Sequence, residues 1–422
     1  MPTLRTVTLG CKVNQYETEF IREGLLRLGY RNAGKDEPAD LCIVNTCTVT
    51  GEGDLKSRKA VRQLARGNPD AEIVVMGCYA TRSPEEVAAL PGVVEVLTDK
   101  RKLPDFLARR GLIDVPGGIS SFGARHRAYV KVQDGCRLRC SYCIIPSVRP
   151  VLASRQVEEV LAEVRRLLEN GYREIVLTGI HLGHYGVDLR KQWATGPRPN
   201  LAHLLTRIAA LNGDFRVRLS SLEAVELTPE LIAAIGNHPD RVCPHLHISM
   251  QSGSDAVLAR MRRRYTSSRF VARCGQVKES LDWPALTTDV IVGFPGETDA
   301  DFETTCRVAE QVGFSKIHVF RFSPRQGTPA AAMQDQVPTR VVQQRAAELA
   351  GLGNLLRHRY FESLLGRSMQ VLLESPLRDY PGMLVGTSER YVPVETPGEP
   401  GLIGRLIRVT AKRLSGDRVM AD

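Results

Sequence analysis

Residues 136–143 read Cys-Arg-Leu-Arg-Cys-Ser-Tyr-Cys, which places Cys136, Cys140 and Cys143 within eight residues. Three closely spaced thiolates with no fourth cysteine or histidine nearby are typical of a [4Fe–4S] cluster in which one iron has no protein ligand. A small molecule can bind at such an open metal position, as it does in catalytic zinc sites. The alternative interpretation is a structural zinc site whose fourth ligand, His126 or His181, comes from elsewhere in the chain.

The cysteine stretch directly follows an apolar, strand-like run, the first of six such runs in the middle of the chain. They cover residues 128–133, 174–178, 215–219, 245–250, 288–292 and 317–322. Helix-like stretches separate most of them, at 156–169, 201–211, 229–235 and 299–312. Six βα units are too few for a complete eight-stranded barrel, so we predict a partial (β/α)6 barrel over residues 122–355. Its functional face is expected at the carboxyl ends of the strands.

Residues 1–114 predict an open parallel α/β sheet. Apolar runs at 6–9, 41–44 and 73–76 alternate with amphipathic stretches at 17–28 and 54–65. Cys11, Cys47 and Cys78 each lie just past the carboxyl end of one run, and those ends share one edge of a parallel sheet. We therefore expect these three thiols to converge and to hold a second [4Fe–4S] cluster with an open iron. The remaining cysteines share no such placement and are interpreted as core or incidental residues: Cys42, Cys243, Cys274 and Cys306.

The tail, residues 364–422, is rich in short strand-like pieces. They lie at 369–373, 382–386, 391–394 and 406–410, and Gly and Pro separate them. This spacing predicts a small antiparallel β-barrel comparable to the oligonucleotide-binding barrels.

Composition limits the class of protein. A chain of 422 residues with 43% hydrophobic and 25% charged residues is expected to fold into two or three domains. No apolar run approaches the roughly 20 residues of a membrane helix, so we expect a cytoplasmic protein, in which ten cysteines favour metal ligation or catalysis over disulfides. Residues 116–360 carry 32 Lys and Arg against 23 Asp and Glu, or nine of the ten surplus positive charges. Such a basic surface suits a polyanion.

The cysteine spacing at 136–143, placed after the first strand of a βα barrel, resembles that of the radical S-adenosylmethionine (SAM) superfamily. The resemblance implies that the open iron binds the amino and carboxylate groups of SAM. It further implies that an electron from the reduced cluster cleaves SAM to a 5′-deoxyadenosyl radical, which can abstract hydrogen from an unactivated carbon.

Residues near the strand ends extend this resemblance to the binding of SAM. Thr178 and Gly179 end the second strand, where the superfamily contacts the amino group of SAM. Near other strand ends, glycines let the backbone approach a ligand closely, and an arginine can clamp a carboxylate through two hydrogen bonds. The predicted SAM contacts are Tyr142, Thr178, Gly179, Glu223, Gln251, Arg263, Gly293 and Gly296.

The whole chain resembles the methylthiotransferase family, which joins a three-cysteine domain, a radical SAM barrel and a TRAM domain in this order. Residues 9–17 and 44–50 resemble the branch that acts on N6-threonylcarbamoyladenosine in tRNA, and residues 323–330 are also family-like. The resemblance implies replacement of the C2 hydrogen of that nucleoside, at position 37, by a methylthio group. One SAM methylates a sulfur on the N-terminal cluster, and a second SAM supplies the radical.

The implied partners are tRNA and an electron donor, either a reductase or a protein of the flavodoxin or ferredoxin type. No membrane and no DNA partner is expected. The TRAM-like tail is expected to clamp tRNA. The candidate arginines for phosphate contacts are Arg125, Arg127, Arg262, Arg263, Arg264, Arg321 and Arg325, although ordinary solvated or ion-paired roles are the alternative for each.

One stretch departs from the family pattern, and other functions stay open. Arg149 is followed by Pro150 where the family commonly has glycine. Because proline fixes φ, we expect another path for this loop and carry no role over to Arg149. The alternative substrates are a ribosomal-protein aspartate and isopentenyladenosine in tRNA. The alternative class is a non-catalytic iron–sulfur or zinc module that binds RNA.

Overall fold

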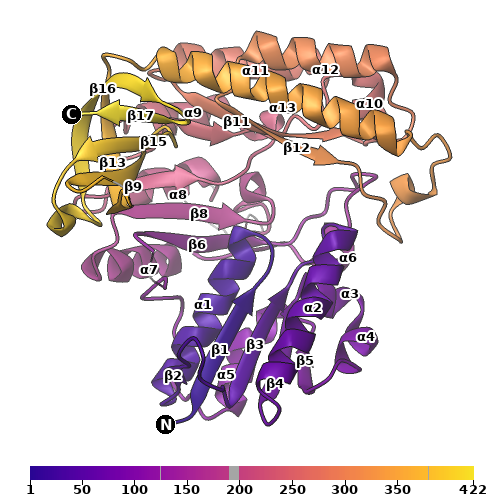
Figure 1. Cartoon of the computed structure of the whole chain (residues 1–422), viewed down its shortest axis with the longest axis vertical. Helices are drawn as coiled ribbons and strands as arrows, with labels where there is room; N and C mark the ends of the chain where they lie inside the picture. Colours follow the sequence, from indigo (N-terminus) through magenta and orange to yellow (C-terminus); the bar gives the residue numbers. More distant parts are fainter. Residues whose placement is uncertain (124, 190–198, 379) are drawn as a thin grey trace. The chain divides into compact units, whose positions relative to one another are not determined.

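The computed structural model describes residues 1–422 except 124, 190–198 and 379 (Figure 1). The chain divides into two compact units. The first comprises Met1–Gly123, Tyr129–Asn170 and Ser323–Ala331, and the second comprises Ala124–Ala128, Gly171–Phe322 and Ala332–Asp422. Within the described part of the chain, no helix has both the length and the apolar character needed to cross a membrane.

The first unit contains a five-stranded parallel sheet in the order β2-β1-β3-β4-β5. Its strands are β1 (Thr3–Thr8), β2 (Arg31–Asn32), β3 (Leu41–Thr46), β4 (Glu72–Gly77) and β5 (Val93–Leu97). The central strand β3 is buried along its whole length, as expected for a parallel sheet covered on both faces. The predicted N-terminal α/β sheet is thus confirmed, and β2 and β5 extend it at its two edges.

Helices connect these strands, and further elements of the first unit follow them. The connecting helices are α1 (Lys12–Arg27), α2 (Gly51–Gly67), α3 (Cys78–Arg82) and α4 (Pro84–Ala88), and α5 (Leu103–Arg109) follows β5. Most of β6 (Arg127–Asp134) also belongs to this unit, with α6 (Ile145–Val148), β7 (Ala153–Ser154) and α7 (Val157–Glu169). The helix α1 begins five residues before the predicted stretch, so its first turn lies directly beside Cys11.

The second unit contains the other strands of the predicted partial barrel. They are β8 (Glu174–Gly179), β9 (Arg216–Leu219), β10 (His245–His247), β11 (Ala285–Val292) and β12 (Lys316–Arg321). All their pairings are parallel, and isolated bridges at Val217–Val242 and Leu222–Ile248 continue the parallel order between the two groups of strands. Together with β6 they form the six strands predicted from the sequence, and the partial barrel is confirmed. Its helices are α8 (Leu201–Ala209), α9 (Pro229–Gly236), α10 (Asp255–Arg260), α11 (Ser267–Ser280), α12 (Asp299–Val312) and α13 (Thr339–Glu362).

The C-terminal residues of the second unit form a small closed barrel of five strands (Figure 1). They are β13 (Ser368–Pro376), β14 (Met383–Ser388), β15 (Pro393–Pro397), β16 (Leu406–Ser415) and β17 (Arg418–Ala421). The predicted antiparallel barrel is confirmed for most pairs. It gains a fifth strand, β17, and β15 pairs with β17 in parallel.

Buried charged side chains connect this small barrel to strands β8 and β9 of the same unit. The Glu174 carboxylate, 0% exposed, accepts hydrogen bonds from Arg216 Nε at 2.7 Å and Arg218 Nε at 3.0 Å. Both guanidinium groups also donate to main-chain carbonyls of the small barrel, Arg216 to Thr387 at 2.8 Å and Arg218 to Glu389 at 2.8 Å. The charge of one buried carboxylate therefore positions two arginines that hold the C-terminal barrel.

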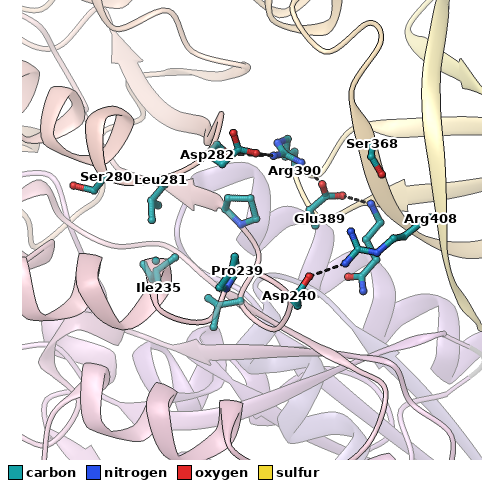
Figure 2. A pocket seen from close by; sticks show the side chains of 14 residues that line it. Ile235, Pro239, Asp240, Ser280, Leu281, Asp282, Ser368, Glu389, Arg390 and Arg408 are labelled. Carbon is teal, nitrogen blue, oxygen red and sulfur yellow. Dashed lines mark hydrogen bonds and ion pairs between the residues drawn. The ribbon is translucent and has the colours of Figure 1, made fainter.

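A cavity of about 320 Å³ lies beside this junction (Figure 2). Its charged lining residues pair with one another, Asp240 with Arg408 at 2.6 Å and Asp282 with Arg390 at 2.9 Å. The described residues that line it include none of the site residues predicted from the sequence.

Candidate functional site

Cys11, Cys47 and Cys78 lie at one edge of the sheet in the first unit. Cys11 is the N-cap residue of α1, Cys47 directly follows β3, and Cys78 begins α3 directly after β4. Because β1, β3 and β4 are neighbours in the sheet, their carboxyl ends share this edge. Gly10 packs so closely that a Cβ there would stand 3.1 Å from Cys47 Sγ. Burial raises the pKa of the Cys47 thiol, and the neighbouring Cys78 and Cys11 raise it further. The predicted convergence is present.

Asn14 joins the loops that carry two of these cysteines. Its buried Nδ2 donates to the carbonyl of Leu9 at 2.9 Å and to that of Thr46 at 3.0 Å. Its Oδ1 lies 3.6 Å from Cys11 Sγ. The sequence analysis did not single out Asn14. The available signal was a polar amide three residues after Cys11, on the first turn of a helix.

The second trio follows β6 in the same unit. Gly135 has a φ of +79°, and a Cβ there would stand 1.9 Å from the carbonyl oxygen of Val151, so the turn into Cys136 requires glycine. The Cys136 amide donates to the carbonyl of Arg149 at 3.1 Å, and that of Cys143 to the carbonyl of Cys140 at 3.1 Å. Cys136 is buried, whereas Cys140 and Cys143 are half-buried.

Arg149 lies at this site, although the sequence analysis carried no role over to it. Its side chain is 1% exposed, and its Nε lies 3.4 Å from Cys78 Sγ. The loop from Arg149 to Val151 contacts Gly135 and Cys136.

The spacing of the thiols bears on the metal that they could hold. A single zinc ion with Zn–S bonds of about 2.3 Å requires sulfur atoms within about 4.6 Å of one another. Among the described residues, only His181, His184 and Glu226 bring three possible ligand atoms within 4.8 Å of one another. The fit to a cluster comes from the donor set instead: each trio offers three thiols, which is the ligand set of a [4Fe–4S] cluster with one open iron.

Most of the predicted SAM contacts lie in the second unit. Thr178 and Gly179 end β8, Gly293 and Gly296 follow β11, and the remaining ones, Glu223, Gln251 and Arg263, lie in the segments after β9 and β10. Parallel pairing places these strand ends on one edge. Tyr142 lies in the first unit, between Cys140 and Cys143.

Several of these residues have partners within the protein. Arg263 pairs with Glu223 at 2.9 Å. A Cβ on Gly293 would stand 2.3 Å from Val342 Cγ2, and one on Gly296 would overlap Arg260. Packing against Val342 and a φ of +73° account for Gly293, and the same φ accounts for Gly296.

Three of the seven candidate phosphate-binding arginines are buried in ion pairs. Arg127 pairs with Glu374 at 2.5 Å, Arg263 with Glu223, and Arg325 with Asp54 at 2.6 Å. The ordinary ion-paired role thus applies to these three. The side chains exposed at the surface are those of Arg125, Arg262, Arg264 and Arg321.

Two family descriptions match the sequence. Residues 130–309 match the radical SAM superfamily, and residues 3–99 match the uncharacterized protein family UPF0004. The first match spans the cysteine stretch at 136–143, and the second spans Cys11, Cys47 and Cys78.

Similar proteins share the organisation of the whole chain. A threonylcarbamoyladenosine tRNA methylthiotransferase of Bacillus subtilis is 39% identical over 97% of this chain and 93% of its own length. One of Thermotoga maritima is 38% identical over 100% and 97%. A tRNA-2-methylthio-N(6)-dimethylallyladenosine synthase of Moorella thermoacetica is 33% identical over 97% and 96%.

A solved structure supports the fold alone. The radical SAM methyltransferase TsrM from Kitasatospora setae, with cobalamin and a [4Fe–4S] cluster bound, superposes with a TM-score of 0.55 at 14% identity and covers 78% of this chain and 77% of its own. The full-length identities above 30% decide the family. This chain belongs to the methylthiotransferases of the radical SAM superfamily.

Proposed function

We propose that this chain adds a methylthio group to C2 of N6-threonylcarbamoyladenosine at position 37 of tRNA, with SAM and two [4Fe–4S] clusters. The observation that carries the proposal is the presence of two cysteine trios within one compact unit, one at the ends of three neighbouring strands and the other in the loop after β6. A second cluster beside the radical SAM cluster is what a sulfur-inserting enzyme requires. The similarity to two threonylcarbamoyladenosine enzymes at 38–39% identity supports this nucleoside.

Each trio has its own part in the proposal. Cys136, Cys140 and Cys143 would hold the cluster that supplies radical chemistry when SAM is bound. Cys11, Cys47 and Cys78 would hold the cluster that carries the sulfur to be transferred. Around them, Asn14 fixes the loops before Cys11 and Cys47 through its two hydrogen bonds to main-chain carbonyls.

The proposed partners are tRNA and a low-potential electron donor of the reductase, flavodoxin or ferredoxin type. The C-terminal barrel is the proposed tRNA clamp, since small β-barrels of this kind bind oligonucleotides. The 33% identity to a dimethylallyladenosine enzyme keeps that tRNA nucleoside as the second candidate.

Comparison of tRNA nucleosides from a wild-type and a deletion strain tests the substrate. We expect loss of 2-methylthio-N6-threonylcarbamoyladenosine only. Loss of the dimethylallyladenosine derivative instead would favour the second candidate, and an unchanged nucleoside profile with a changed ribosomal-protein peptide would contradict the tRNA proposal.

Three cysteine variants test the two clusters. Cys47→Ala should retain reductive SAM cleavage and lose the methylthiolated product, whereas Cys140→Ala should lose both. The matched control is Cys42→Ala, because Cys42 lies on β3, the strand that Cys47 follows, and is buried in the sheet core. This control should retain product and about eight irons per chain. Normal product from Cys47→Ala would remove the second cluster from the proposal.

A further inference from the structure

Arg149 uses all of its hydrogen-bond donors inside the first unit. Its Nη1 donates to Glu17 at 2.7 Å and to Asp134 at 2.9 Å, and its Nη2 donates to Glu17 at 2.8 Å and to Asn14 at 3.1 Å. The remaining donor, Nε, lies 3.4 Å from Cys78 Sγ. Five N–H groups thus have five acceptors, and the guanidinium cannot rotate without breaking several hydrogen bonds.

The network around Arg149 is buried and balanced in charge. The Glu17 side chain, 1% exposed, meets the guanidinium in a two-point fork, and Lys131 bridges Glu17 and Asp134 at 2.7 and 2.6 Å. The positive charges of Arg149 and Lys131 therefore balance the negative charges of Glu17 and Asp134. Burial by itself would lower the pKa of Arg149, but Glu17 and Asp134 raise it well above its ordinary value. The guanidinium stays charged beside the sulfur.

The same residue links the two cysteine trios. Its Nε lies beside Cys78 Sγ. Its Nη2 donates to Asn14 Oδ1, the same oxygen atom that lies next to Cys11 Sγ. Its main-chain carbonyl accepts the amide of Cys136, and its partner Asp134 lies two residues before that cysteine.

We propose that Arg149 is a positioning residue that holds Cys78 and raises the reduction potential of the N-terminal cluster through its Nε–H···S hydrogen bond. Hydrogen bonds to cluster sulfurs are among the features that set the potential of an iron–sulfur centre, and an N–H dipole that points at the sulfur stabilises the more negative, reduced form. This inference rests on the proposed function, because it requires a cluster at Cys11, Cys47 and Cys78.

The test uses the full-length chain with Cys136, Cys140 and Cys143 replaced by alanine, so that only the N-terminal cluster is observed. Arg149→Lys keeps the charge but loses Nε–H and the fork. The matched control is Arg155→Lys, since Arg155 pairs with the buried Glu163 and donates to the carbonyl of Gly117 in the same unit. The measurements are iron per chain, thermal unfolding, and the midpoint potential from an anaerobic redox titration followed by electron paramagnetic resonance.

We expect Arg149→Lys to shift the midpoint to a more negative potential while Arg155→Lys leaves it unchanged. If Arg149→Lys folds but loses its iron and Arg155→Lys keeps about four irons, the positioning role is supported. An unchanged midpoint in Arg149→Lys overturns the inference, and so does equal loss of iron in both variants. Absence of a cluster from the parent chain is a distinct outcome, because it would refute the proposed function itself.

Discussion

Gly77 offers a stringent test of how the strand ends gather the cysteines. It directly precedes Cys78 and has φ +101° and ψ −170°. A Cβ at Gly77 would stand 2.3 Å from the carbonyl oxygen and 2.5 Å from the amide nitrogen of Thr46, the residue before Cys47. In Gly77→Ala, the end of β4 must therefore move away from the end of β3, which separates Cys78 from Cys47.

Gly77→Ala is expected to lower the free energy of unfolding for two reasons, and a matched variant separates them. A non-glycine residue at such a φ costs about 1–3 kcal/mol, and the steric overlap costs about 1–3 kcal/mol more. Gly29 has φ +87° with nothing within 4 Å of a Cβ, so Gly29→Ala carries only the first of these costs. For a unit of this size, each additional kcal/mol lowers the melting temperature by about 2–4 °C.

Iron analysis and thermal unfolding of anaerobically reconstituted protein measure both effects. Gly29→Ala should retain about eight irons per chain. Gly77→Ala should melt at a lower temperature than Gly29→Ala and approach four irons, while reductive SAM cleavage continues. The reasoning is refuted if the two variants melt together and both keep eight irons.

Three other predictions concern buried charge and tRNA. Glu174→Gln should destabilise the protein by about 3–5 kcal/mol in urea unfolding, because it leaves buried arginines without a countercharge; exposed Glu230→Gln should stay within about 0.5 kcal/mol. The folded-state pKa of Glu174 lies well below its ordinary value, so its contribution is complete above about pH 4.3 and declines as the pH falls below that value. Variant and wild type should converge only as the pH falls through the lower, folded-state pKa. Asp54→Asn should destabilise the first unit by about 3 kcal/mol, since Arg325 and Arg82 both pair with Asp54; unchanged stability would refute this. Affinity for tRNA should fall steeply between 50 and 200 mM salt in a filter-binding assay, and a flat dependence would count against phosphate contacts.

The grouping of the cysteines at one sheet edge could be predicted from the sequence, because it follows from local rules. A strand that ends in a parallel sheet delivers the next residue to a common edge, and this places Cys11, Cys47 and Cys78 together. The helix α12 was predicted at its observed bounds, since Thr298 and Asp301 form a capping box and Gly313 closes the helix in the left-handed region.

The parts that escaped prediction depend on contacts between distant residues. Arg149 meets Glu17 across 132 positions of the chain and Cys78 across 71, and no local pattern reports such a pairing. The short strand β17 and its parallel pairing with β15 likewise follow from closure of the small barrel. The buried ion pairs of Arg127, Arg263 and Arg325 were indistinguishable in sequence from solvated surface charges.

The attachment of the C-terminal barrel limits how this protein could be shortened or rearranged. Arg216 and Arg218 have their guanidinium groups capped by peptide carbonyls of residues 370–389. Deleting the barrel would remove the carbonyl acceptors of two buried cations, so the tail is a structural requirement of the strands that carry them. A domain joined by a flexible linker could be exchanged between proteins. This barrel could be exchanged only together with Glu174 and its two arginines.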